Sequence, residues 1–304
     1  MAQPLLASLR VRLRDQAPGS RIEVLAPPWV APVLRRMAEV DEVIEAVLRH
    51  GELQLGERWS LGRALKARGY AEAIVLPNTV KSVLVPFFAG VPVRTGYGRS
   101  LLLNCAHRVR EEATSLQYAR LAQAPGTEPA LPLPFPSLLS SNEKIAATTA
   151  RFGIHGRYIA LCPGAEYGPA KRWPYFRELA SALNSPVVLL GGPGDLEGNR
   201  GLPGTNLIGK TTLDEAIDLI AGAQAVVSND SGLMHVAAAT GRPLVALFGS
   251  SSPERTPPLS AHARVVWLKP ECSPCFARIC PLGHFKCMRE LPAERVLHEL
   301  QALA

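Results

Sequence analysis

Long hydrophobic runs are missing from this sequence: no stretch approaches the roughly 18 uninterrupted apolar residues of a membrane-spanning helix. Residues 1–4 also lack the basic start and apolar core of a signal peptide, so we expect a cytoplasmic protein. No G-x-G-x-x-G fingerprint occurs in a βαβ setting, which argues against a nucleotide-dependent oxidoreductase. Dense Lys/Arg blocks and basic segments interleaved with aromatic residues are absent too, which disfavours a nucleic-acid partner.

What the sequence does have is a basic charge balance and enough apolar residues for sizeable cores. The 304 residues carry a formal net charge of +7, and 47% of them are hydrophobic. This charge favours a polyanionic partner, and we expect a phosphorylated substrate or an anionic membrane surface. The alternative is a basic surface that only keeps the protein soluble.

Short apolar segments alternate with longer amphipathic ones, which is typical of a parallel α/β fold. Prolines are dense over residues 124–137 and indicate a linker or extended loop. We therefore predict two α/β domains, residues 1–150 and residues 151–304, with a cleft between them. The expected strands are residues 21–25, 73–76, 158–161 and 186–190, and the expected helices are residues 5–14, 61–68, 83–88, 175–183 and 213–221.

The most informative segment joins a strand, a polar turn and a helix over residues 225–239. Asp230 or Ser231 is expected at the N-cap of the helix, where free N–H groups and the helix dipole favour an anion. His235 follows four residues after Ser231 and can face the same site. A second apolar strand at residues 243–249 completes a βαβ unit, which makes a phosphate site more probable than an ordinary capped helix.

Two further loops of the second half carry groups suited to a nucleotide. Residues 163–174 combine glycines, which allow close backbone approach, with Lys171 and Arg172, whose charges suit a pyrophosphate. Residues 191–197 end another strand and contain carboxylates that could accept hydrogen bonds from ribose hydroxyls. A basic surface loop and a polar turn are the alternative interpretations of these two segments.

Residues 163–174 (PGAEYGPAKRWP) and 229–239 (NDSGLMHVAAA) resemble signatures of the bacterial ADP-heptose:lipopolysaccharide heptosyltransferases, glycosyltransferase family 9. Residues 76–82 and 257–260 resemble that family as well, so the likeness runs along nearly the whole chain. It implies a GT-B fold of two Rossmann-like domains. The implied reaction is inverting transfer of heptose from ADP-heptose to the heptose–Kdo inner core of lipopolysaccharide. Heptosyltransferase I or another core glycosyltransferase of the family remains an alternative.

The resemblance also implies roles for particular residues. Lys171 would stabilise the leaving phosphates, without an obligatory metal cofactor. The remaining donor contacts would come from Gly164, Glu197, Asp230, Ser231, Gly232 and His235. Asn78 and Lys81 would lie on the acceptor side, and the acceptor, Kdo-lipid A bearing heptose, would place the enzyme at the inner face of the inner membrane.

The sequence departs from the family at its beginning. Family members start with a strand, a glycine-containing loop and an Asp taken as the general base for the acceptor hydroxyl. This sequence aligns from Met1 just beyond that Asp, so we expect the first strand and the base to be missing and the true start to lie upstream. Because losing a general base costs about 100- to 10,000-fold in rate, a non-catalytic nucleotide-sugar-binding protein is an alternative.

Four cysteines gather near the end of the chain in the pattern C-x2-C-x4-C-x6-C, with His284 among them. Thiolates at such spacing could close a tetrahedral structural zinc site. Free thiols are the alternative, because the spacing matches no standard zinc module, and disulfides do not suit a reducing cytosol. The candidate ligands are Cys272, Cys275, Cys280 and Cys287.

Overall fold

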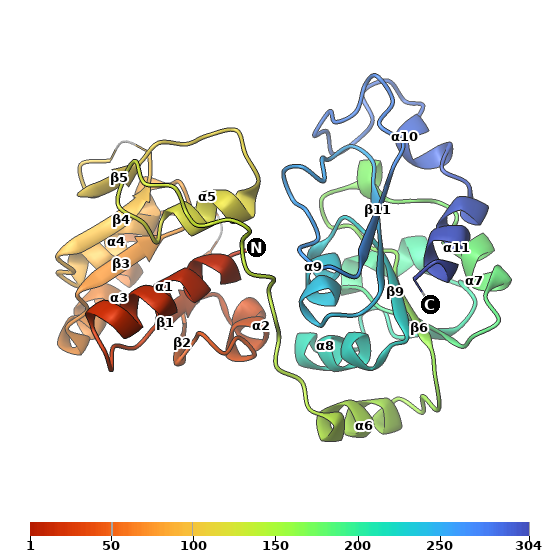
Figure 1. The fold of residues 1–304 in the computed structure, drawn as a ribbon, viewed down its shortest axis with the longest axis horizontal. Helices are drawn as coiled ribbons and strands as arrows, with labels where there is room; N and C mark the ends of the chain where they lie inside the picture. The colour runs from red at the N-terminus through yellow and green to blue at the C-terminus, as the bar shows by residue number, and fades with distance from the viewer. Residues whose placement is uncertain (50, 99, 304) are drawn as a thin grey trace. The chain divides into compact units, whose positions relative to one another are not determined.

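The computed structural model describes residues 1–49, 51–98 and 100–303, and they form two compact units (Figure 1). Unit 1 comprises residues 1–31 and 39–134, and unit 2 comprises residues 32–38 and 135–304. The expected boundary at residue 150 differs from this division. Leu138 and Ile154 are buried in a core of unit 2, so the chain changes unit before helix α6 (Asn142–Arg151).

Unit 2 is built on a six-stranded parallel sheet in the order β11-β10-β9-β6-β7-β8. Counted along the chain, this is the 3-2-1-4-5-6 order of a doubly wound nucleotide-binding fold, with its switch point between β6 and β9. The strands are β6 (Ile159–Cys162), β7 (Val187–Leu189), β8 (Thr205–Asn206), β9 (Ala225–Asn229), β10 (Leu244–Phe248) and β11 (Ala263–Trp267).

Helices cover both faces of this sheet, because successive strand residues point to opposite sides. Ala160 and Cys162 of β6 pack with α8 and α9, whereas Ile159 and Leu161 pack with α7 and α11. Burial on both faces explains why every residue of β9 and β10 is buried and why β10 is a continuous apolar run. The helices are α7 (Phe176–Ala182), α8 (Leu213–Gly222), α9 (Gly232–Ala239), α10 (Lys286–Arg289) and α11 (Ala293–Gln301).

Unit 1 is also parallel α/β, but its described strands form two separate sheets, β1-β2 and β3-β4-β5. The described chain opens in helix α1, so the expectation that a strand precedes it stays a prediction. The elements are α1 (Gln3–Gln16), β1 (Glu23–Ala26), α2 (Ala31–Arg35), β2 (Glu42–Glu45), α3 (Leu55–Leu65), β3 (Glu72–Val75), α4 (Val80–Phe88), β4 (Val93–Tyr97), β5 (Cys105–His107) and α5 (Thr114–Arg120). No helix in the described ranges is long and apolar enough to cross a membrane.

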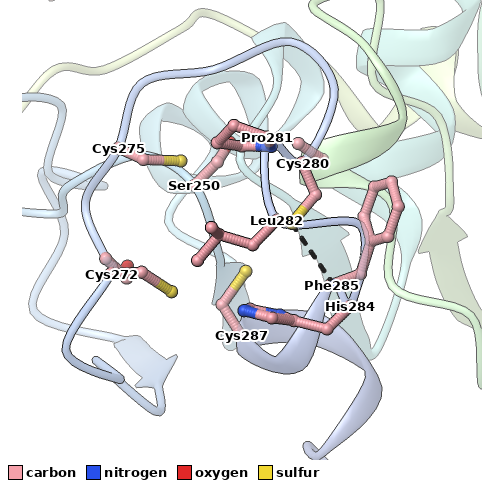
Figure 2. A pocket seen from close by; sticks show the side chains of 11 residues that line it. Ser250, Cys272, Cys275, Cys280, Pro281, Leu282, His284, Phe285 and Cys287 are labelled. Atoms are coloured by element: carbon pink, nitrogen blue, oxygen red, sulfur yellow. Dashed lines mark hydrogen bonds between the residues drawn. The ribbon is translucent and has the colours of Figure 1, made fainter.

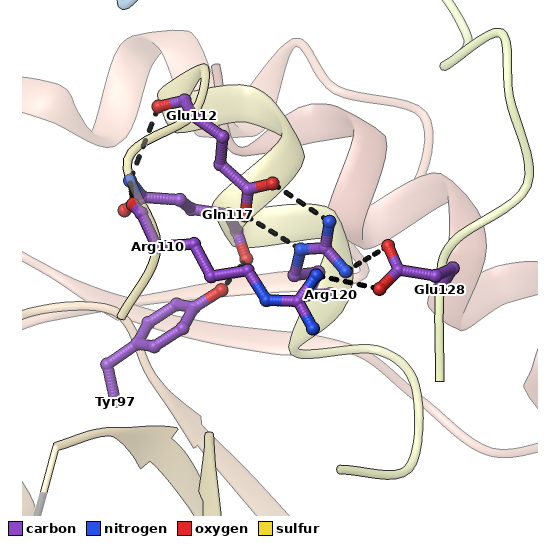
Figure 3. Close-up of polar contacts among 6 residues, drawn as sticks. All are labelled: Tyr97, Arg110, Glu112, Gln117, Arg120 and Glu128. Atoms are coloured by element: carbon purple, nitrogen blue, oxygen red, sulfur yellow. Dashed lines mark hydrogen bonds and ion pairs between the residues drawn. The ribbon is translucent and has the colours of Figure 1, made fainter. Parts of the chain in front are cut away.

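An ion-pair network anchors α5 within unit 1 (Figure 3). The buried Arg120 guanidinium donates to both carboxylate oxygens of Glu112, at 2.7 and 2.8 Å, and also pairs with Glu128. The hydroxyl of Tyr97 donates to the Gln117 carbonyl, which ties the end of β4 to the same helix. Since bidentate Arg–carboxylate pairs fix orientation as well as adding energy, this network holds the α5 end of the unit in one arrangement.

Residues 32–38 join unit 2 through a buried arginine. Arg36 is 6% exposed, and its Nη1 lies 2.5 Å from Oδ1 of Asp218, which is 4% exposed. Its Nε donates to Asp214 at 3.0 Å, and its carbonyl accepts from the Leu139 N–H at 2.8 Å. The two carboxylates raise the pKa of the Arg36 guanidinium, with the Asp218 hydrogen bond as the largest contribution. The charge therefore stays paired at neutral pH.

Candidate active site

The two loops that carry the sequence motifs leave neighbouring strands of unit 2. Residues 163–174 follow β6 and residues 230–231 follow β9, and these strands pair directly in parallel. Both loops therefore lie at the carboxyl ends of the strands that flank the switch point, where doubly wound folds bind their ligands. The position of the site follows from the strand order of this unit alone.

Asn229 hydrogen-bonds to both ends of the loop of residues 163–174, a role that its place in the motif did not predict. Its side chain is fully buried, its Nδ2 donates to the Pro163 carbonyl at 2.7 Å, and its Oδ1 accepts from the Trp173 N–H at 3.2 Å. A buried amide with a donor and an acceptor both satisfied by backbone groups fixes the loops in register. The signal available in the sequence was its place as the last residue of an apolar strand.

The centre of the site is an ion pair between Lys171 and Asp230. Lys171 Nζ lies 2.5 Å from Asp230 Oδ2, and Asp230 is 5% exposed. Ser251 donates to the same carboxylate oxygen, and the Lys171 ammonium lies 4.8 Å from the ring centroid of Tyr167. Burial strengthens the pair and makes an unpaired member costly. The loop holds one ammonium group at a fixed place beside the start of α9.

Ser231 occupies the N-cap of α9, one of the two residues expected at that position, and its side chain makes no capping hydrogen bond. The Ser231 hydroxyl lies 3.4 Å from that of Ser228, and the Asp230 carboxylate faces Lys171 instead. The first-turn N–H groups of α9 are thereby left for a bound anion, beside the exposed Gly232, where a Cβ would meet nothing within 4 Å.

His235 lies one helical turn after Ser231 and is half-buried. Burial lowers the pKa of its imidazole, so the ring is neutral at neutral pH. A neutral imidazole offers one donor and one acceptor nitrogen, which suits hydroxyl groups better than phosphate oxygens. The structure thus brings Lys171, Asp230, Ser231, Gly232 and His235 into one part of unit 2.

The sequence motif contains more than one carboxylate that could face the ribose. Glu197 begins the 3-10 helix Glu197–Asn199 and is exposed. Asp195 stands nearer the motif: it accepts from the Gly192 N–H at 3.1 Å and lies 3.6 Å from Arg172. A Cβ on Gly164 would lie 2.1 Å from Asp195 Oδ2, so a larger residue there would displace the Asp195 carboxylate. Asp195 is the acidic residue that the structure adds to the candidate site.

The two predicted acceptor-side residues lie in unit 1, around the start of α4. Asn78 is exposed in the loop after β3. Lys81 is half-buried, and its Nζ donates to the Glu52 carbonyl at 3.4 Å. The Lys81 carbonyl in turn accepts from Arg58 at 2.9 Å. These contacts fix the loop after β3 within its own unit.

The cysteine-rich segment supports the Lys171 loop from one side. All six cysteines are free thiols. The four predicted ligands line one small pocket (Figure 2). Among the described residues, however, no three His, Cys, Asp or Glu side chains lie close enough together to hold a metal. Cys105 and Cys162 lie in strands outside this pocket. The zinc site stays a prediction.

Replacing Gly168 by Ala tests the contact between these two segments. Gly168 has φ +146°, and a Cβ would lie 2.5 Å from the carbonyl oxygen of Arg278. Because backbone must move to admit the methyl group, we expect a loss of about 1–3 kcal/mol in unfolding free energy, measured by urea denaturation. Gly194→Ala is the control, since a Cβ there meets nothing within 4 Å. Equal stability of the two variants would contradict the close packing.

Comparison with known proteins identifies this arrangement of fold and loops. Residues 58–286 match the model of glycosyltransferase family 9 (heptosyltransferase), and the chain belongs to that family. The predicted family and the predicted enzyme class, a glycosyltransferase, are confirmed.

Among particular relatives, lipopolysaccharide heptosyltransferase 2 of Escherichia coli K12 is 43% identical over 331 aligned residues, covering 100% of this chain and 94% of the relative. Lipooligosaccharide heptosyltransferase 2 of Haemophilus influenzae is 40% identical, covering 86% of this chain and 84% of the relative. These relatives support a role in heptose transfer during lipopolysaccharide core biosynthesis.

Solved structures agree with the fold. The E. coli ADP-heptose lps heptosyltransferase II structure superposes with a TM-score of 0.87 at 40% identity, over 99% of this chain and 93% of that one. The structure of E. coli heptosyltransferase WaaC with ADP has a TM-score of 0.70 at 22% identity, over 100% and 97%, and shows the same fold. The predicted α/β fold class, with parallel sheets as in GT-B heptosyltransferases, is confirmed.

Proposed function

We propose that this enzyme transfers heptose from ADP-heptose to the heptose–Kdo inner core of lipopolysaccharide, with inversion at the anomeric carbon. The observation that carries the proposal is the buried Lys171–Asp230 pair beside the uncapped start of α9, at the switch point of unit 2. A nucleoside diphosphate fits this site, because an ammonium group and helix N–H groups both favour its phosphates.

Different residues of unit 2 bind different parts of the donor. Lys171 stabilises the charge that develops on the leaving diphosphate, with the N–H groups of Ser231 and Gly232 contributing from the helix. Gly164 lets the diphosphate approach the backbone. Neutral His235 hydrogen-bonds to hydroxyl groups of the sugar, and Asp195 or Glu197 accepts from the ribose. This assignment needs no metal ion for the transfer step.

On the acceptor side, Asn78 and Lys81 bind the phosphate-bearing and acidic inner core. No residue of the printed sequence is assigned as the general base for the acceptor hydroxyl. In this proposal the acceptor is a lipid at the inner face of the inner membrane, and the basic charge of the chain favours that anionic surface. Binding to anionic vesicles that weakens as salt rises is the expected result, and salt-insensitive binding would contradict it.

The proposed reaction is tested by measuring ADP release from ADP-heptose with three mixtures: no acceptor, Kdo-lipid A, and mono-heptosylated Kdo-lipid A. We expect release only with the heptosylated acceptor, and product analysis should show the inverted anomer. Equal release with Kdo-lipid A would instead favour the activity of another family member. ADP binding without release in any mixture would mean that this chain binds the donor but does not transfer the sugar.

A further inference from the structure

The four cysteines of residues 272–287 surround a cavity of about 20 Å³ (Figure 2). Cys272, Cys275 and Cys280 come from the loop between β11 and α10, and Cys287 comes from α10. Ala170, of the loop that carries Lys171, lines the same cavity. Four sulfur groups from one loop and the helix that follows it thus line a cavity that the Lys171 loop also lines.

Two of the thiols have environments that a surface cysteine would not show. Cys280 Sγ accepts a hydrogen bond from the Phe285 N–H at 3.4 Å. Cys287 is 8% exposed. A sulfur held by a backbone N–H and a buried sulfur thus line the same cavity.

A second observation concerns Ser250, which also lines the cavity. Its hydroxyl is buried, at 1% exposure for the residue, and has no hydrogen-bond partner among the residues that the structure describes. Buried hydroxyls are nearly always paired. An unpaired buried hydroxyl in the lining of a cavity that four thiols also line indicates a site for a bound group.

We propose that Cys272, Cys275, Cys280 and Cys287 bind one divalent metal ion of thiolate preference, with zinc as the best match. Binding replaces the four thiol protons, which pass to solvent, by four sulfur–metal bonds. His284 is left out of the ligand set because its Nδ1 already accepts from the Lys286 N–H at 3.0 Å.

The described side chains stand around the cavity without closing on its centre, so binding requires them to turn inward. Cys275 is exposed and Cys272 is half-buried, so rotation about their Cα–Cβ bonds meets few neighbours. The dianionic centre would be offset by nearby positive charges on the same segment, from Arg278, Lys286 and Arg289.

The consequence for the enzyme lies in the four residues between the second and third ligands. The Phe276 carbonyl accepts from the Tyr167 hydroxyl, and the Arg278 carbonyl accepts from the Ala170 N–H at 3.0 Å. The Phe276 N–H donates to the Ser250 carbonyl at 2.7 Å. A metal that fixes Cys275 and Cys280 therefore fixes the backbone on which the Lys171 loop rests.

The metal site is tested on the full chain, produced with zinc and purified under a non-chelating reductant. We expect about one zinc per chain by elemental analysis, and near zero for the double variant C272S/C275S. Cys105→Ser is the matched control, because Cys105 lies in β5 outside the cluster, and it should keep its metal. Zinc near zero in the unmodified chain, or equal zinc in the double variant, would overturn the proposal.

A second measurement decides the case even if the double variant does not fold. The metal-free unmodified chain is titrated with Co²⁺, and we expect the charge-transfer and visible bands of tetrahedral cobalt–thiolate coordination, saturating near one equivalent. Absence of these bands, or an intact mass that shows two disulfides in the reduced preparation, would exclude a thiolate centre.

The proposed effect of the metal on the Lys171 loop rests on the proposed function and is measured separately. Metal removal should raise the KM for ADP-heptose about tenfold or more while changing kcat less, because the loop is loosened and not removed. An unchanged KM, with metal stoichiometry and cobalt bands as expected, would overturn the link and leave the metal site intact. If no transfer occurs at all, the affinity for ADP takes the place of KM.

Discussion

Replacing Lys171 by Met lowers kcat/KM for ADP-heptose by about 10²- to 10³-fold, the usual cost of removing one preorganised group that stabilises developing charge. Methionine keeps the length and apolar stem of lysine and removes the ammonium that lies 2.5 Å from Asp230 Oδ2. The loss should fall mainly on kcat if the ammonium acts on the leaving diphosphate, and on KM if it only holds the donor. Steady-state ADP release at several donor concentrations separates the two.

Loss of stability must be separated from loss of catalysis, because Lys171→Met leaves the buried Asp230 carboxylate without its ion-pair partner. Asp230 would keep Ser251 as its remaining partner, and we expect the unfolding free energy of unit 2 to fall. The double variant K171M/D230N removes both charges, so it should recover stability without recovering activity. Lys144→Met, at an exposed position of α6, is the control for loss of a surface charge. Recovery of activity in the double variant would show that Lys171 has only a structural role.

The elements that form the candidate site could be predicted from the sequence, because they depend on local patterns. The strands at residues 225–227 and 243–249 and the polar turn between them correspond to β9, β10 and the turn before α9. Each of these elements is recognised from residues close together in the sequence: a short apolar run, a small polar turn and an Ala-rich helix. Strand order then brings two such turns together.

The assignment of Asp230 could not be predicted in the same way. Local sequence offers it and Ser231 as equivalent caps, and the choice is made by Lys171, 59 residues away. Asp195 and Asn229 also acquire their roles through contacts with loops distant in sequence. Long-range pairing of polar side chains is a property of tertiary structure, which spacing does not encode.

The division into units also depends on contacts between residues distant in sequence. The chain passes from unit 1 to unit 2 within the proline-dense residues 124–137, whereas the expected boundary was residue 150. Helix α6 shows strong amphipathic patterning and packs on α8, so it belongs to unit 2. In the sequence, Arg36 was one more basic residue of the first half. Its place in unit 2 depends on Asp218, 182 residues later.

Replacing that arginine by Met should destabilise unit 2 by about 3–5 kcal/mol, the cost of leaving one member of a buried ion pair without its partner. Asp218 is 4% exposed, and its remaining described partner is the Thr148 hydroxyl at 3.4 Å. Asp214 is half-exposed and can return to water, so most of the loss should come from Asp218. Urea denaturation followed by tryptophan fluorescence measures the change in the unit 2 transition.

Two further variants test whether the buried charge of Arg36 holds residues 32–38 to unit 2. Arg151→Met removes the exposed partner of Glu215 on the same α6–α8 face and should cost no more than about 1 kcal/mol, as exposed pairs do. The double variant R36M/D218L replaces the buried pair by apolar side chains and should regain most of the stability lost in R36M. If R36M alone costs less than about 1 kcal/mol, the pair is hydrated in solution. Residues 32–38 would then be held to unit 2 by the apolar contacts of Val33 and Met37 and not by the buried charge.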